Sequence, residues 1–210
     1  MNDFGAPSTY LALGDSAGVG VGAVDGRGYP GHVVEQLAAA GISLRLELLA
    51  QSGATTRDVV RAQLPRLPKV APKLVTLGIG TNDLWRMVPL PEIVESLRTI
   101  GKALALLRAP VLVSNVIDLS LAPVRVMVER IMHVPMDAFH TRLDGINGAL
   151  STMCTQHGFR LVDLHGFSRR ELPSHPEYFS ADGFHPSTAG YRAWARLVTD
   201  AAREVTGVST

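Results

Sequence analysis

The sequence has almost no cysteine, little net charge and no long apolar stretch, and each shortage excludes a class of protein. A single cysteine, Cys154, excludes an internal disulfide framework, and we interpret it as a core residue. The formal net charge of +1 gives no reason to expect nucleic acid as a partner. No stretch approaches the roughly 20 apolar residues of a membrane span, so we expect no stable membrane insertion.

The first residues also lack the basic start and apolar run of a secretory signal peptide. We therefore expect a cytoplasmic protein, although a chain trimmed of its leader would look the same. The 210 residues suffice for one domain with a substantial core. Because no repeat, linker or low-complexity segment divides the chain, we predict a single domain over residues 1–210.

Short apolar runs alternate with segments of helical periodicity along the chain. The predicted strands are Tyr10–Leu13, Leu44–Ala50, Leu74–Leu77, Val111–Val113 and Phe159–Leu164. One predicted helix begins at Tyr29–Gly31 and ends at Gly41, and a second follows a cap at Thr55 or Thr56. Three more span Pro91–Leu107, Met136–His157 and Pro186–Val205. Residues 18–22 are predicted as a flexible loop. Buried-looking strands separated by helices favour an α/β fold with a mostly parallel five-stranded sheet.

Ser16 stands at the carboxyl end of the first predicted strand, where ligands bind in α/β sheets. A serine hydroxyl is a weak nucleophile unless a base takes its proton. Asp182 and His185 lie three residues apart in a turn that Gly183 permits, and Pro186 keeps His185 out of regular helix geometry. One short turn can therefore carry a base and the carboxylate that orients it.

These residues suggest a hypothesis for catalysis. Ser16 attacks an ester carbonyl, His185 takes the serine proton and later gives it to the leaving alcohol, and Asp182 orients the imidazole. The oxyanion is held by the backbone N–H groups of Ser16 and Gly53 and by the side-chain amide of Asn82, which follow three different strands. Asp15 adjoins the serine and is interpreted as a structural residue that fixes the loop.

Four blocks of the sequence resemble, in order, the motifs of the SGNH hydrolases, also called GDSL lipases or esterases. They are Gly14-Asp15-Ser16, Gly53, Gly80-Thr81-Asn82-Asp83 and Asp182-Gly183-Phe184-His185-Pro186. The resemblance implies a flavodoxin-like, three-layer α/β/α sandwich and hydrolysis of acyl esters without a metal or cofactor. The chain departs from the name motif at Ala17, where the family has leucine.

Other functions suggested by short motifs fit the sequence less well. Residues 18–23 match the dinucleotide pattern G-x-G-x-x-A, but the helix that should begin inside these glycines opens near Pro30. Asp163 and His165 are an alternative acid and base, yet Asp163 is interpreted as the end of a strand. Asp182 and His185 have no histidine partner at metal-ligand spacing, so we expect no metal.

The sequence constrains the substrate less than the reaction. Trp85, Arg86 and Met87 follow the Asn82 motif and are candidates to line the substrate site or to pack in a loop. The apolar stretch within residues 117–134 is a candidate acyl site, core segment or subunit interface. Small or medium acyl esters are the expected substrates, with thioesters and lysophospholipids as alternatives. A non-catalytic ligand-binding module and an acyltransferase to a non-water acceptor remain open, as does the oligomeric state.

Overall fold

The structure is a computed structural model that describes residues 8–123 and 135–206. Its centre is a five-stranded sheet in the order β2-β1-β3-β4-β5, in which every described pair of strands is parallel. The strands are β1 (Ser8–Gly14), β2 (Leu44–Leu48), β3 (Leu74–Gly78), β4 (Val111–Ser114) and β5 (Arg160–Val162). The predicted α/β class and parallel five-stranded sheet are therefore confirmed.

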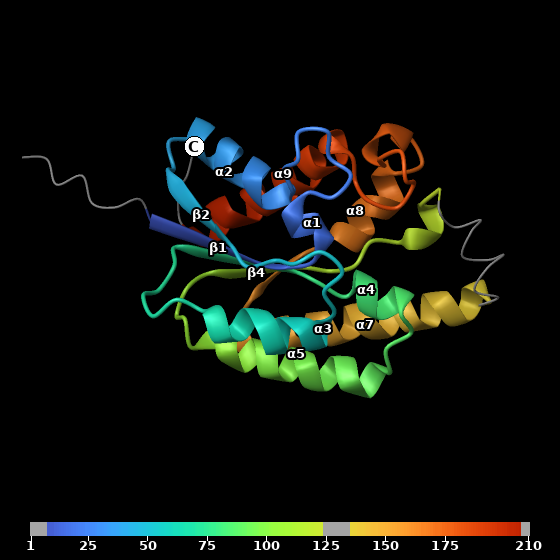
Figure 1. The fold of residues 1–210 in the computed structure, drawn as a ribbon, viewed down its shortest axis with the longest axis horizontal. Coiled ribbons are helices and arrows are strands. Elements are labelled where there is room, and N and C mark those ends of the chain that lie inside the picture. The colour runs from blue at the N-terminus through green and yellow to red at the C-terminus, as the bar shows by residue number, and fades with distance from the viewer. Residues whose placement is uncertain (1–7, 124–134, 207–210) are drawn as a thin grey trace, which may run out of the picture.

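Helices cover both faces of this sheet. On one face lie α1 (Ser16–Val19), α2 (Tyr29–Ala39), α8 (Leu164–Glu171) and α9 (Thr188–Thr206) (Figure 1). On the other lie α3 (Thr56–Asp58), continued by a π-helix η1 (Val59–Gln63) and the 3-10 turn η2 (Leu64–Arg66), with α4 (Thr81–Trp85), α5 (Leu90–Ala105) and α7 (Met136–His157). The arrangement is the expected three-layer α/β/α sandwich.

Alternation along the strands divides the core into two layers. Leu11 and Leu13 of β1 pack in the cluster shared with α5 and α7, whereas Tyr10 and Ala12 pack in the cluster shared with α2 and α9. Successive strand side chains point to opposite faces, so both faces of β1 are buried. The continuous apolar run of this strand, without polar alternation, follows from that double burial.

Two predicted boundaries near the functional motifs were wrong. Residues 16–19, half of which we expected in a flexible loop, form the short helix α1, because Asp15 accepts a hydrogen bond from the Ala17 N–H at its start. Helix α9 begins at Thr188 rather than at Pro186. Pro186 instead forms an isolated antiparallel bridge with Phe179, which closes the preceding turn.

The sequence analysis missed α4 and α8, which are short and carry few apolar residues. Asp163, interpreted as the end of a strand, lies beyond β5 and caps α8 by accepting a 2.9 Å hydrogen bond from the Gly166 N–H. The apolar segment 117–134 is described only in part. A 3-10 turn, η3 (Leu119–Leu121), lies in its first half, and residues 124–134 lie outside the described residues.

Within the described ranges, no helix has both the length and the apolar character needed to cross a bilayer. The amphipathic helices α5 and α9 instead bury one face each against the sheet, through Ile93, Leu97 and Ile100 on α5 and Tyr191 and Val198 on α9.

The end of β1 is held by the side chain of Gln63, which lies in the helical layer that contains α5 and α7. Gln63, at the end of η1, accepts a 2.9 Å hydrogen bond from the Gly14 N–H and donates a 2.8 Å hydrogen bond to the Gly14 carbonyl. Gly14 has φ +142°, and a Cβ there would lie 2.2 Å from the Gly78 carbonyl oxygen. The strand therefore ends in a glycine pressed against β3, directly before Asp15 and Ser16.

We predict that Gln63→Leu destabilises the protein by about 1–3 kcal/mol, because it leaves the buried Gly14 N–H without an acceptor. The Gly14 carbonyl keeps its second donor, the Gln51 N–H. Urea denaturation measures the effect. Gln51→Leu, at an exposed position, is the matched control and should change stability by less than about 0.5 kcal/mol. Equal effects of the two variants would contradict this role of Gln63.

Candidate active site

Three polar loops follow neighbouring strands at one edge of the sheet. Ser16 follows β1, Gly53 follows β2 and Asn82 follows β3, and these three strands lie side by side in the sheet. Parallel strands end at the same edge, which is the ligand-binding edge of open α/β sheets. The side chain of Ser16 is held at the first position of α1, and the residue is only 7% exposed.

A chain of hydrogen bonds joins Ser16 to the turn before α9. His185 Nε2 lies 3.1 Å from Ser16 Oγ, and His185 Nδ1 lies 2.7 Å from Asp182 Oδ2. With Nδ1–H donating to the carboxylate, Nε2 is free to accept the serine proton. The structure thus brings together the three side chains that the sequence analysis selected as nucleophile, base and orienting acid.

The Asp182 carboxylate also organises its own turn. Its Oδ1 accepts hydrogen bonds of 2.8 Å from the backbone N–H groups of Phe184 and His185 and from the hydroxyl of Ser180. Partial burial raises the pKa of Asp182, but the hydrogen bonds from His185, Phe184 and Ser180 outweigh it and hold the pKa well below the ordinary value. Asp182 therefore stays a carboxylate at neutral pH and can hold the His185 ring in place through Nδ1.

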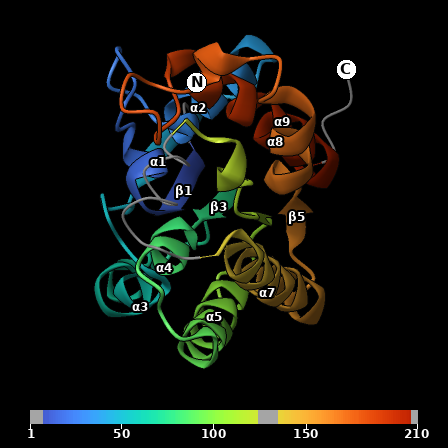
Figure 2. The same cartoon turned by 90° about the vertical axis from the view of Figure 1, so that its right-hand side faces the viewer.

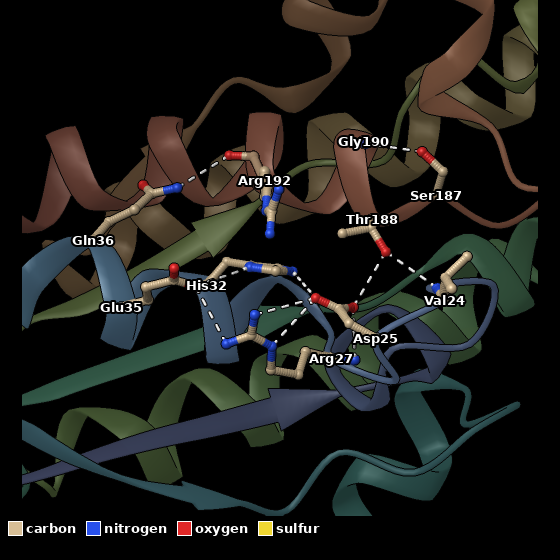
Figure 3. A network of polar contacts seen from close by, with 10 residues as sticks. All are labelled: Val24, Asp25, Arg27, His32, Glu35, Gln36, Ser187, Thr188, Gly190 and Arg192. Carbon is tan, nitrogen blue, oxygen red and sulfur yellow. Dashed lines mark hydrogen bonds and ion pairs between the residues drawn. The ribbon is translucent and has the colours of Figure 1, made fainter.

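The segment after α1 contacts the start of α9, which directly follows this turn (Figure 3). Thr188, at the start of α9, donates a 3.2 Å hydrogen bond to Asp25 and accepts a 3.1 Å hydrogen bond from the Val24 N–H. Asp25 is in turn held by an ion pair with Arg27, at 3.2 Å. Because Gly22 also packs closely against the Cβ of His185, the chain that follows the nucleophile contacts the chain that carries the base.

The proposed oxyanion donors occupy two linked loops. Asn82 Nδ2 donates a 3.0 Å hydrogen bond to the carbonyl of Ala54, the residue after Gly53, and keeps its second N–H. The Gly53 N–H has no acceptor among the described residues. Asp83 accepts hydrogen bonds from the Thr56 N–H and hydroxyl, so two successive residues of α4 brace the loop that carries Gly53.

The backbone N–H of Ser16 is available for the same reason that the residue begins a helix. The first N–H groups of a helix have no acceptor within it, and the cap Asp15 accepts from Ala17 instead. Three donors from three loops therefore lie at the same edge of the sheet as the Ser16 hydroxyl.

An apolar cavity of about 70 Å³ opens beside Ser16 and His185. It extends toward β4, β5 and α8, where Leu119, Phe167 and Leu172 are part of its wall. Gly53 and Asn82 are not among the described residues that line it. The cavity therefore extends from the serine hydroxyl toward the β4 and β5 side of the sheet, whereas Gly53 follows β2 at the other end of the strand order.

Two of the predicted substrate-lining residues, Trp85 and Met87, differ in position. The Trp85 ring lies 5.4 Å from the ring of Phe184, which lines the cavity, so Trp85 is one contact away from it. Met87 is 41% exposed and adopts a positive φ of 54°, and it is not among the residues of the cavity wall. Asp163, the alternative acid, accepts a 3.0 Å hydrogen bond from Asn115 Nδ2 and caps the start of α8.

The sequence analysis overlooked one polar residue of this edge, Gln63, which forms hydrogen bonds with both backbone groups of Gly14 at the end of β1. Arg86, one of the three residues considered after the Asn82 motif, ends α4 and lies beside Gly53. Gln63 belongs to no motif with a recognisable spacing, because it acts on a residue distant in the sequence. A helical pattern after Thr55 was the only signal near Gln63.

Comparison with known proteins agrees with this geometry. The family model of the GDSL-like lipase/acylhydrolase family matches residues 12–193. The chain belongs to the GDSL-like lipase/acylhydrolase family. No protein with a curated description matches this family member significantly in sequence.

Solved structures share the fold of this GDSL-like protein along nearly its whole length. TesA has a TM-score of 0.74 at 20% identity, over 94% of this chain and 99% of that one. The lipase/acylhydrolase from Enterococcus faecalis has a TM-score of 0.69 at 22% identity, over 95% and 96%. An acetyl-xylooligosaccharide esterase from Geobacillus, in a mutant form, has a TM-score of 0.63 at 21% identity, over 98% and 96%.

Asp15 is a second carboxyl group at the site, in a very different environment from Asp182. It is 4% exposed, and burial raises its pKa to about 7; the hydrogen bond from Ala17 lowers the pKa and the nearby Asp83 charge raises it. The folded-state pKa therefore lies above the unfolded value of about 3.9. The folded chain holds this proton longer, so stability falls as the pH rises from about 4 to about 7.

We predict that Asp15→Asn stabilises the protein at pH 8, on the order of a few kcal/mol, and has little effect at pH 4. Asparagine stays neutral and can still accept the hydrogen bond from Ala17. Denaturation of both proteins across this pH range measures the difference. A difference between them that does not change with pH would contradict the raised pKa.

Proposed function

We propose that the protein is a serine ester hydrolase that cleaves small or medium acyl esters through an acyl-enzyme intermediate. The observation that carries this proposal is the hydrogen-bonded series from Ser16 Oγ through His185 to Asp182, at 3.1 and 2.7 Å. In this proposal Ser16 is the nucleophile, His185 the general base and acid, and Asp182 the group that orients the imidazole and stabilises its charged form.

In the first half-reaction, Ser16 Oγ attacks the ester carbonyl carbon while its proton passes to His185 Nε2. The carbonyl oxygen becomes an oxyanion that the N–H groups of Ser16, Gly53 and Asn82 stabilise. The intermediate then collapses, the bond to the leaving oxygen breaks, and His185 gives its proton to that oxygen. The alcohol departs, and the acyl group stays esterified to Ser16.

In the second half-reaction, water takes the place of the alcohol. His185 Nε2 accepts a proton from the water as its oxygen attacks the acyl carbon, and the same donors hold the second oxyanion. Breakage of the bond to Ser16 Oγ returns the proton from His185 to the serine and releases the carboxylic acid. The low pKa of Asp182 supports both steps, because its negative charge stabilises the imidazolium each time.

The apolar cavity supports an acyl group as the part of the substrate that is buried. Its volume of about 70 Å³ exceeds the roughly 10–15 Å³ that one water needs, and Leu119, Phe167 and Leu172 in its wall offer no charge to an acyl chain. A short or medium acyl chain buries apolar surface there at about 25 cal/mol per Å². The Geobacillus neighbour, named as an acetyl-xylooligosaccharide esterase, makes acetyl esters a reasonable short extreme to test.

We predict that Ser16→Ala lowers kcat for a 4-nitrophenyl acyl ester by about 10⁴-fold or more, because no nucleophile remains. Circular dichroism should show the same fold as in the unaltered protein. Ser151→Ala, at an exposed position of α7, is the matched control and should keep full activity. Turnover by Ser16→Ala at the original rate would refute the assignment.

We predict that Asn82→Ala lowers kcat by about 10²–10³-fold with a smaller change in KM, since the oxyanion forms only along the reaction path. The variant also loses the bond to Ala54, so a structural control is needed. Thr56→Val removes a neighbouring brace, the hydroxyl bond to Asp83, but no oxyanion donor. A loss of kcat as large in Thr56→Val would mean that Asn82 acts only through the loop.

A further inference from the structure

Arg86 places a positive charge directly beside the loop of Gly53. Its backbone N–H donates a 2.9 Å hydrogen bond to the Asn82 carbonyl at the end of α4, which anchors the residue next to the proposed oxyanion donors. Its side-chain Nη2 lies 3.2 Å from the position that a Cβ would take on Gly53. Gly53 has φ +76°, a conformation that favours glycine, so the guanidinium can approach the backbone there without meeting a side chain.

The guanidinium of Arg86 has no hydrogen-bond or ion-pair partner in the part of the chain that the structure describes, and the residue is exposed. The nearby carboxylate of Asp58 already accepts from the Thr55 N–H at 2.9 Å and from the Thr55 hydroxyl at 2.7 Å. These bonds hold the pKa of Asp58 below its ordinary value, and the charges of Arg86 and Arg57 lower it further against a small effect of burial. Two cations, Arg57 and Arg86, thus face one carboxylate, whose Oδ2 already accepts two hydrogen bonds from Thr55.

The position of the cavity indicates which part of a substrate would meet Arg86. The cavity extends from Ser16 toward β4, β5 and α8, whereas Gly53 follows β2 at the opposite end of the sheet. Figure 2 shows α3 and α4 on one side of the molecule and α8 on the other. An ester whose acyl chain fills the cavity places its carbonyl oxygen at the proposed donors and its leaving oxygen at His185, so only the far end of the leaving group, away from β5, can reach Arg86.

From these observations we propose that Arg86 forms a subsite for an anionic oxygen group, a carboxylate or phosphate, carried by the leaving group of the ester. This subsite rests on the proposed hydrolase function. A guanidinium presents its N–H donors in a planar fork that matches the oxygens of carboxylates and phosphates. The preferred substrate then has an apolar acyl chain on one side of the scissile bond and a negative charge on the other.

The test compares two butyryl esters that differ only in charge: those of 4-hydroxybenzoate and of 4-hydroxybenzamide. In Arg86→Gln, the ratio of kcat/KM for the anionic ester to that for the neutral ester should fall about fivefold, mainly through KM, as expected for an exposed charged contact. Arg86→Lys keeps the charge and should recover part of the ratio. Added salt should raise KM for the anionic ester of the unaltered protein.

A second pair distinguishes the two anions. The pair is butyryl glycerol 3-phosphate and monobutyryl glycerol. If phosphate is the group recognised, Arg86→Gln should lower the charged-to-neutral ratio of kcat/KM more in this pair than in the first pair. If carboxylate is the group recognised, it should lower the ratio less. Arg57→Gln is the matched control, since Arg57 also faces Asp58 but no contact places it at Gly53. It should leave both ratios close to those of the unaltered protein.

Three outcomes would overturn the subsite. An equal loss of kcat on charged and neutral esters in Arg86→Gln would mean that Arg86 stabilises the oxyanion rather than an anionic leaving group. If Arg57→Gln lowers the charged-to-neutral ratios of kcat/KM as much as Arg86→Gln does, the effect comes from the overall positive charge of this surface and not from a subsite at Arg86. If the unaltered protein hydrolyses none of the four esters, the proposed function is overturned, and the subsite with it.

Discussion

The contact between His185 Nε2 and Ser16 Oγ joins residues that are 169 positions apart, and the chemistry depends on it. The sheet supplies one half by ending β1 at its carboxyl edge, where Gln63 fixes both backbone groups of Gly14. The other half is the turn before α9, which Asp182 ties together from within. Neither half could carry out the proposed chemistry by itself, so the packing of α9 against the sheet is part of the candidate active site.

Two carboxyl groups near Ser16 illustrate how the surroundings decide the role of a residue type. Asp182 receives hydrogen bonds from a hydroxyl, two backbone N–H groups and an imidazole, and its pKa falls. Asp15 is more deeply buried and accepts fewer hydrogen bonds, so burial raises its pKa to about 7. Only the first can stay charged beside a base that must take up a proton, which agrees with its proposed role.

Sequence reasoning predicted the central strands β1, β3 and β4 well because their two-sided burial leaves continuous apolar runs. It selected Ser16, Asp182 and His185, which the structure brings within hydrogen-bond distance, because they stand in motifs of fixed local spacing. Short helices such as α4 and α8 escaped it because they bury too few residues to show a period. Sequence position marked Arg86 only as a loop or substrate-lining residue. Its contact with Gly53, 33 positions earlier, could not be inferred, because contacts across the fold leave no spacing in the sequence.

The central claim is that Ser16 is a nucleophile activated by His185, and covalent labelling tests it most directly. A fluorophosphonate reacts with a serine whose hydroxyl is activated, and peptide mass spectrometry locates the adduct. The mechanism predicts one adduct per chain, on Ser16, and a much slower reaction in His185→Ala. An unlabelled Ser16 in a protein that hydrolyses acyl esters, or labelling at the same rate without His185, would contradict it.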